Sequence, residues 1–150
     1  MAKNPLKNFP EPDKTDMQIL SVLKSDSRKP IKDIAKQTNL RPSTVHSRIQ
    51  RLIKSGAIEK FTVKLSNQAV GENFIVFMLI STGKDLEPAF FRNPHIKEVF
   101  GVTGEYDLLL KLKFSGVEEF NTFLLSLRKY PHIKETLTMV ATINLKEELH

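Results

Sequence analysis

The chain has 150 residues, of which 40% are hydrophobic and 27% are charged, a composition typical of a globular protein. Its longest apolar run, residues 74–80, has the length of a strand and is too short for a membrane span, and the first residues lack the apolar core of a signal peptide, so we expect a cytoplasmic protein without membrane contact. There is no cysteine, which excludes disulfides, thiolate metal ligands and a cysteine nucleophile.

Positive charge is concentrated in the first part of the chain. Residues 1–64 hold 14 Lys/Arg and 6 Asp/Glu, a balance of +8, whereas residues 65–150 hold 9 and 11, a balance of −2. Such an asymmetry indicates that the N-terminal part meets a polyanion and that the C-terminal part has another role. A solvated basic surface without a partner would carry the same charge, so the charge alone does not decide.

Three short helices are predicted after a flexible tail at residues 1–12. Residues 13–24 have helical apolar spacing, residues 25–30 form a polar break, and Ile31 opens a second helix. A third helix starts at Pro42, a residue suited to a first helical turn, and ends at Gly56. Residues 58–65 alternate like a strand or β-wing. This order is typical of a helix-turn-helix domain, here winged, over residues 13–64.

The third helix has one apolar stripe and one polar, basic face. In a helix-turn-helix domain this helix enters the major groove, where hydroxyl groups allow close approach, Arg binds guanine edges or phosphates, and Gln pairs with adenine. The lysines and arginines around it are better placed for phosphates: Arg28, Lys29, Lys32 and Lys54. The DNA-binding candidates are Arg41, Ser43, Thr44, His46, Ser47, Arg48, Gln50, Arg51 and Lys54.

The sequence of this half resembles the DNA-binding half of the Lrp/AsnC regulators, also called feast/famine regulatory proteins. Three segments carry the resemblance: DKTDMQILSVL, then IAKQTNL, then TVHSRIQRLIKSGAI. One departure is Arg41, where the family usually has a serine that caps the helix. We expect this loss to weaken the helix start by about 1 kcal/mol unless Ser43 compensates, and Arg41 to be a further phosphate contact.

A polar linker at residues 65–73 leads to a second predicted domain, residues 74–150. Its elements follow the order β-α-β-β-α-β, which is that of a ferredoxin-like fold. The predicted ranges are strand 74–80, helix 86–92, strand 99–103, strand 106–114, helix 117–129 and strand 136–145. The whole chain is therefore predicted to be α+β, with a helix-turn-helix domain joined to a ferredoxin-like domain.

The pentapeptide PHIKE occurs twice, at residues 94–98 and 131–135. Each copy follows a helix and precedes a strand, and the second and fourth strands of a ferredoxin-like fold are equivalent edge strands. The repeat is therefore interpreted as architectural. His95 and His132 would lie near opposite edges, a poor arrangement for zinc, which needs three or four convergent ligands, so no metal site is predicted.

The copies diverge after PHIKE, where the first continues VFGVTGEYD. Glycines beside carboxylates suit a zwitterion, because bare amides hold its carboxylate and Asp107 its ammonium group, although an ordinary hairpin loop fits these residues as well. The segment VTGEYDLLLKL resembles the Lrp/AsnC effector domain. That resemblance implies an amino-acid effector at Gly101, Gly104, Tyr106 and Asp107, with Thr136 and Thr138 of the last strand facing the same cleft. Glu105, at a position that varies in the family, is a further candidate, and no cofactor is predicted. Glu105 and Asp107 together suggest a cationic amino acid.

The strand at residues 74–80 is apolar on both faces, and one layer of helices covers only one of them. A second copy of the chain would cover the other, and the family resemblance implies dimers that assemble into rings such as octamers, with the effector between dimers. One rival reading is an RNA-binding or metabolite-binding ferredoxin-like protein without operator specificity. Another is an enzyme, but no catalytic pairing has a recognisable spacing, so no catalytic residue is predicted.

Overall fold

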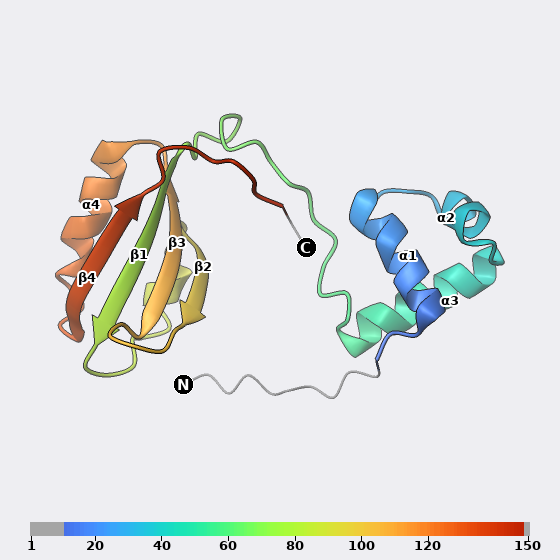
Figure 1. The fold of residues 1–150 in the computed structure, drawn as a ribbon, viewed down its shortest axis with the longest axis horizontal. Coiled ribbons are helices and arrows are strands. Elements are labelled where there is room, and N and C mark those ends of the chain that lie inside the picture. Colours follow the sequence, from blue (N-terminus) through green and yellow to red (C-terminus); the bar gives the residue numbers. More distant parts are fainter. Residues whose placement is uncertain (1–10, 149–150) are drawn as a thin grey trace. The chain divides into compact units, whose positions relative to one another are not determined.

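The computed structural model describes residues 11–148 and divides the chain into two compact units, with the division between Lys64 and Leu65 (Figure 1). The first unit holds all of the helices of the predicted DNA-binding half. The second holds a four-stranded sheet and its covering helix, together with residues 65–73. None of the helices formed by residues 11–148 is long and apolar enough to cross a membrane.

The first unit consists of α1 (Lys14–Ser25), α2 (Ile31–Thr38) and α3 (Pro42–Ser55). This confirms the three predicted helices. Asn39 ends α2 in the left-handed conformation and Gly56 ends α3 in the same way, which fits residues that tolerate positive φ. The apolar stripes of the three helices meet in one core, made of Ile19, Leu23, Ile34, Ala35, Val45 and Ile49.

The predicted strand at residues 58–65 is not present. Among the described residues, the segment from Ile58 to Asn73 has no strand, and its alternating apolar side chains point into solvent. Phe61, Val63 and Leu65 are 50%, 63% and 58% exposed. Alternation favours a strand only where another strand offers hydrogen bonds, and none of the described strands pairs with this segment.

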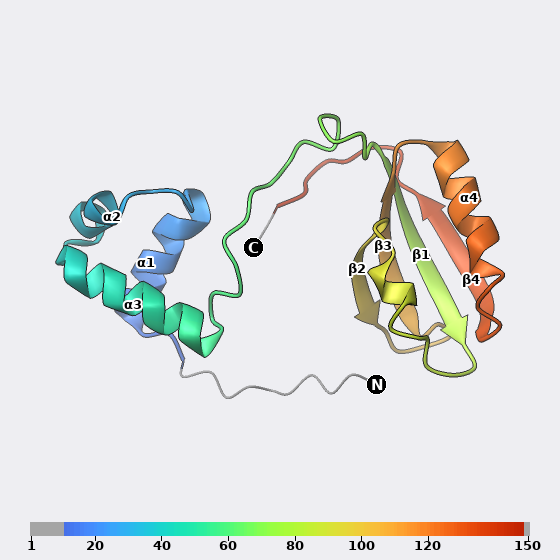
Figure 2. The same ribbon diagram turned by 180° about the vertical axis from the view of Figure 1, so that it is seen from behind.

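The second unit confirms the ferredoxin-like prediction. Its elements are β1 (Phe74–Thr82), the short 3₁₀ helix η1 (Phe90–Arg92), β2 (Ile96–Gly101), β3 (Leu108–Phe114), α4 (Val117–Leu127) and β4 (Ile133–Val140). The strands pair in the antiparallel order β2-β3-β1-β4, so β2 and β4 are the edge strands as predicted. Helices α4 and η1 lie on the same face of the sheet (Figure 2).

Several predicted boundaries were wrong. The strand expected at residues 99–103 spans residues 96–101, the strand expected from residue 106 begins at Leu108, and the helix expected to end at residue 129 ends at Leu127. The helix expected at residues 86–92 is only the single turn η1, because Pro88 interrupts a segment too short for a stable helix. The last strand was expected at residues 136–145, but β4 begins three residues earlier and ends at Val140. After Ala141, whose amide still donates to Ile75 O (2.9 Å), the chain leaves the sheet.

The repeated PHIKE segments form the same structure twice. In each, the isoleucine amide closes a turn to the third residue before it: Ile96 N to Asn93 O and Ile133 N to Tyr130 O, both 3.0 Å. Each edge strand then has a register irregularity at its Lys, because Lys97 and Lys134 fall between paired neighbours. Such a bulge sends the isoleucine to the helix side and the glutamate to the opposite side. The architectural interpretation of the repeat is therefore supported residue by residue.

The sheet has one covered face and one open face. The covered face packs the even-numbered residues of β1 and β3 against α4 and η1, with Met78, Ile80, Leu110 and Leu112 fully buried. The open face carries the odd-numbered residues of the same strands, which helices do not cover. Three of its edge-strand side chains, Phe100, Leu137 and Met139, are 52%, 45% and 44% exposed.

Candidate functional sites

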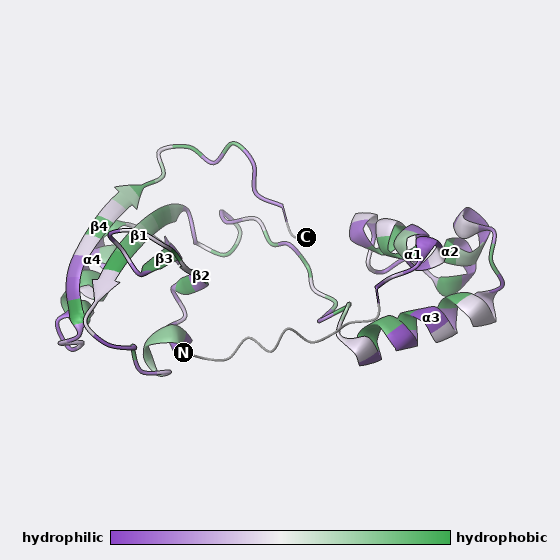
Figure 3. Cartoon of the chain, turned by 60° about the horizontal axis from the view of Figure 1, so that its bottom comes forward, coloured by the Kyte–Doolittle hydropathy of each residue, from purple (hydrophilic) through white to green (hydrophobic). Residues whose placement is uncertain are grey.

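Helix α3 presents a continuous polar stripe to solvent. Four of its polar residues are spaced by four, three and four positions, which places them on one side of the helix: Ser43, Ser47, Gln50 and Lys54. His46 lies beside them. All five side chains are exposed. In Figure 3 polar and apolar residues alternate along α3, as expected for a helix with one side in a core. This stripe is the solvent-facing polar side of α3.

The start of α3 is uncapped, as the sequence predicted. Arg41 precedes the helix in an extended conformation and its side chain makes no capping hydrogen bond. Pro42 occupies the first turn, where a missing N–H costs little. Among the described residues, the Ser43 side chain does not replace the missing cap, so the first turn of α3 has no side-chain cap at its amides.

Arg48 and Arg51 lie on the other polar edge of α3, against α1. Arg48 Nη1 contacts Asp13 Oδ2 (2.6 Å) and Asp16 Oδ1 (3.0 Å), and Arg51 Nη2 pairs with Asp16 Oδ2. The Asp16 side chain is only 1% exposed. Hydrogen bonding to Arg48 and to the Asp16 amide lowers the pKa of Asp13 to about 2, and the two carboxylates raise the pKa of Arg48.

These contacts change the role expected for the two arginines. Sequence reasoning placed both on a face free for DNA, but the guanidinium groups hold α1 to α3 and leave little of Arg48 in solvent, 24% of its side chain. Asp13 and Asp16 were expected to favour the helix start. They do so through a capping box, in which each side chain accepts from the other's amide. The missed signal is that a buried aspartate needs a cationic partner.

The candidate cations outside α3 lie just before α2 and in its first turn. Arg28 and Lys32 are exposed, and Lys29 Nζ donates to Gln37 Oε1 at 3.2 Å. Thr44 is half-buried, and its carbonyl accepts from Ser47 Oγ at 3.1 Å. Lysine side chains without a carboxylate partner suit phosphates, whose contacts set register rather than sequence.

The loop between β2 and β3 is a closed turn. Val102 N donates to Asp107 O (3.0 Å) and Asp107 N to Ile80 O (2.9 Å), which fixes both ends of the loop to the sheet. Gly104 has φ +124°, a conformation that side chains rarely adopt, so this glycine is required by the turn. Asp107 Oδ2 accepts from the Thr82 amide at 2.6 Å. One carboxylate oxygen of Asp107 therefore holds the end of β1.

Tyr106 lies among acidic side chains from two segments. Partial burial, Glu135 and Glu105 all raise the pKa of the Tyr106 phenol. Glu135 comes from β4, where it pairs with Ser81 across the end of β1. Sequence reasoning missed Glu135 in this region, although it is the last residue of the second PHIKE. The structure thus brings the loop and the start of β4 together.

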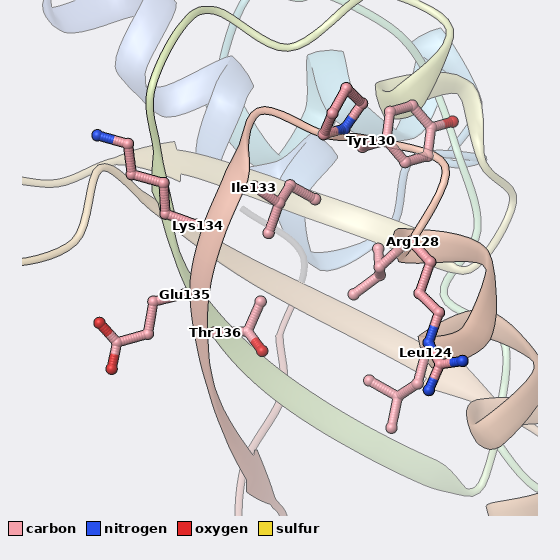
Figure 4. Close-up of a pocket in the computed structure, with 9 residues that line it drawn as sticks. Leu124, Arg128, Tyr130, Ile133, Lys134, Glu135 and Thr136 are labelled. Atoms are coloured by element: carbon pink, nitrogen blue, oxygen red, sulfur yellow. The ribbon is translucent and has the colours of Figure 1, made fainter.

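Thr136 and Thr138 lie on the other side of the sheet from Glu135, because side chains alternate along β4. Thr136 lines a shallow groove of about 410 Å³ between β4 and the end of α4, with Leu124, Arg128 and Ile133. In Figure 4 Thr136 points toward Leu124 while Glu135 points away from the groove. The two threonines were expected to face the same cleft as the loop, and within one chain they face α4 instead.

His95 from the first PHIKE packs into the covered face. Its ring stacks on Phe114 with centroids 4.7 Å apart, and Nδ1 lies 3.1 Å from Lys113 O. Glu119 approaches Nε2 at 3.8 Å. No group of three or more His, Asp or Glu side chains suited to a metal ion occurs in the part of the chain that the structure describes.

Two family models match the chain. Residues 12–59 match a winged helix-turn-helix DNA-binding model, and residues 76–149 match the Lrp/AsnC ligand-binding domain. Among curated proteins, the HTH-type transcriptional regulator FL11 of Pyrococcus horikoshii is 36% identical over 139 residues, covering 90% of this chain and 92% of its own length. The FL11 protein of Pyrococcus furiosus is 38% identical over 132 residues, covering 85% and 87%.

Solved structures share the fold over nearly the whole chain. An AsnC family transcriptional regulator from Agrobacterium tumefaciens aligns with a TM-score of 0.85 at 22% identity, covering 92% of this chain and 95% of its own. A transcriptional regulator from Neisseria meningitidis, solved as a complex with L-methionine, aligns with a TM-score of 0.80 at 24% identity, covering 91% and 93%.

Proposed function

Because the chain belongs to the Lrp/AsnC family of DNA-binding transcriptional regulators, we propose that an amino acid bound at the loop between β2 and β3 modulates its DNA affinity or assembly. A chain with a helix-turn-helix unit and a ligand-binding unit has both parts that such regulation needs. The observation that carries the proposal is the closed, glycine-containing turn, where Glu105 of the turn and Glu135 of β4 both act on Tyr106.

For DNA, we propose direct readout by the exposed stripe of α3. Gln50 offers an amide to adenine, and the hydroxyls of Ser43 and Ser47 permit a close approach to base edges. Arg28, Lys32 and Lys54 contact phosphates, together with Arg41 at the uncapped helix start. Arg51, whose side chain is 54% exposed, keeps donors for a phosphate while paired with Asp16. Arg48 acts by holding α3 in place.

For the effector, we propose a cationic amino acid. The ammonium group is held by the Asp107 oxygen that Thr82 does not use, and the carboxylate by amides around Gly104. Glu105 and Glu135 give this region the negative charge that favours a basic side chain. The Neisseria regulator and a feast/famine regulatory protein from M. tuberculosis were solved with L-methionine, which supports an amino acid as the ligand class and makes methionine the comparison ligand.

For assembly, we propose a homodimer formed through the open face of the sheet, with dimers joined into larger rings and the effector at the contact between dimers. The partly exposed apolar side chains of the open face, such as Phe100 and Leu137, favour burial against another copy. At a contact between dimers, Thr136 and Thr138 of one chain can face the loop between β2 and β3 of a chain in the neighbouring dimer.

Calorimetric titration of the full chain with lysine, arginine, methionine and leucine tests the effector proposal. We expect the two cationic amino acids to bind most tightly. Asp107→Asn should weaken binding by about tenfold or more, because a charge-assisted hydrogen bond contributes about 1.5–3 kcal/mol. Glu118→Gln, on the exposed side of α4, is the matched control and should bind like the wild type. Equal affinity for lysine and leucine would contradict a cationic effector, and no heat with any amino acid would contradict the effector role.

A further inference from the structure

Two lysines interrupt the apolar open face of the sheet. Lys111 and Lys113 follow Leu109 at every second position of β3, so all three point to the side away from α4. Across the ladder, Phe77 faces Lys111 and Leu79 faces Leu109. The lysine side chains are only 16% and 12% exposed. Cations so far out of water need partners, because burial of an unpaired charge is costly.

The C-terminal segment supplies the main partner. After β4 the chain crosses the end of the open face (Figure 1), and Glu147 Oε1 lies 2.5 Å from Lys111 Nζ and 2.9 Å from Lys113 Nζ. Its other oxygen accepts from Asn67 Nδ2 at 3.2 Å, while Asn67 Oδ1 accepts from Lys113 at 2.7 Å. Glu98 of β2 adds a second carboxylate to Lys111 at 3.0 Å.

This arrangement makes the lysine cluster neutral. Two ammonium groups meet two carboxylates, of which only Glu98 belongs to the sheet. Hydrogen bonds from both lysines lower the pKa of Glu147 to about 2, and those to Glu147 and Glu98 raise the pKa of Lys111 against the effect of burial. Both groups therefore stay ionised across the neutral range.

The same segment adds apolar surface beside the sheet. Ile143 and Leu145 are 69% and 86% exposed, although they are large apolar side chains. Together with Ile75 and Phe77 they line a groove of about 510 Å³ where the segment passes over the sheet. Exposed apolar side chains next to a neutralised charge cluster are typical of a surface that another protein covers.

We propose that residues 143–147 form part of the surface on which a second copy of this chain docks, and that Glu147 permits this docking by neutralising Lys111 and Lys113. The inference rests on the proposed dimer through the open face. In a two-fold dimer the same surface of both copies forms the contact, so residues 143–147 of one copy lie against the same surface of the other. Without Glu147 both copies would bring an uncompensated positive charge to the contact, and like charges there would oppose association.

Sedimentation equilibrium of the full chain over a range of concentrations measures this directly. We expect Glu147→Gln to raise the dimer dissociation constant by about tenfold or more, as truncation of a buried charge pair does in other interfaces. Glu148→Gln is the matched control, since it makes the same charge change one residue later. Glu148 pairs with Lys146 at 3.2 Å where both side chains are more than half exposed, so its dissociation constant should not change.

A rescue variant separates neutralisation from a general role in folding. In Lys113→Met/Glu147→Gln one lysine charge is gone and Lys111 keeps its partner Glu98, so the cluster is neutral without Glu147 and we expect the wild-type dissociation constant to return. This variant also decides the matter if Glu147→Gln alone fails to fold. A double variant that folds as a monomer, or a Glu147→Gln dimer as tight as wild type, overturns the inference while the dimer itself stands. A wild-type chain that is monomeric at every concentration overturns the proposed dimer, and this inference with it.

Discussion

Arg48 and Gln50 are two residues apart on α3 and have different surroundings. The Arg48 guanidinium is held between Asp13 and the buried Asp16, whereas Gln50 is exposed on the stripe with Ser43 and Ser47. Both are polar residues on a basic helix, so periodicity alone put them in one group. What separates them is the position of α1, which brings two carboxylates to one edge of α3 and none to the other.

Alanine at each position should therefore fail in a different way. Gln50→Ala is expected to lower affinity for the specific site by about 1–3 kcal/mol, the loss of one bidentate base contact, with an unchanged melting temperature. Arg48→Ala is expected to lower the melting temperature of the helix-turn-helix unit, since the buried Asp16 loses a partner. Binding titrations and thermal melts distinguish the two, with Gln18→Ala on the exposed side of α1 as control. An Arg48→Ala chain of wild-type stability that no longer binds DNA would restore Arg48 as a base-reading residue.

At the scale of elements, strong periodicity made the long segments predictable. Helices α1 and α3 have apolar residues at helical spacing, and β1 is apolar on both faces, so their existence and type followed from the sequence. The missing wing and the shortened helix η1 did not follow, because each depends on whether a tertiary partner exists. The candidate site was predictable only in part. The glycines and Asp107 stand together in the sequence, but Glu135 and Glu147 reach their partners through the fold.

The bulges of the two PHIKE copies make a prediction about the edge strands. Lys97 is the extra residue between the pairs Ile96–Leu112 and Glu98–Lys111, so its deletion should leave a regular ladder. We expect the deletion to lower the free energy of unfolding by less than about 1 kcal/mol. Part of that loss comes from the surface ion pair between Lys97 and Glu72. Deletion of Val99, a paired residue, shifts the register and moves the side chains that follow to the wrong face. Its chain should melt at a clearly lower temperature. Equal melting temperatures for the two deletions would contradict the bulge as the reason for the repeat.

At the scale of the whole molecule, the two units have separate chemistry. The first is basic, with an exposed stripe on α3. The second has the closed loop between β2 and β3, a neutralised lysine cluster and an open apolar face. In an effector-controlled regulator, ligand binding at the second unit changes the affinity of the first unit for DNA. The size of this change is the coupling free energy between the two sites. The proposed effector should therefore change DNA affinity, either directly or through assembly.

The affinity of the full chain for DNA from its own promoter region, measured with and without saturating lysine, tests this account most directly. We expect lysine to change the dissociation constant by about fivefold or more, the usual lower range of allosteric coupling. Gly104→Ala strains the turn between β2 and β3, because Gly104 has a positive φ there. This variant should bind DNA with the wild-type affinity and lose the response to lysine. DNA binding that stays identical with lysine, arginine and every other amino acid would contradict an effector-controlled regulator.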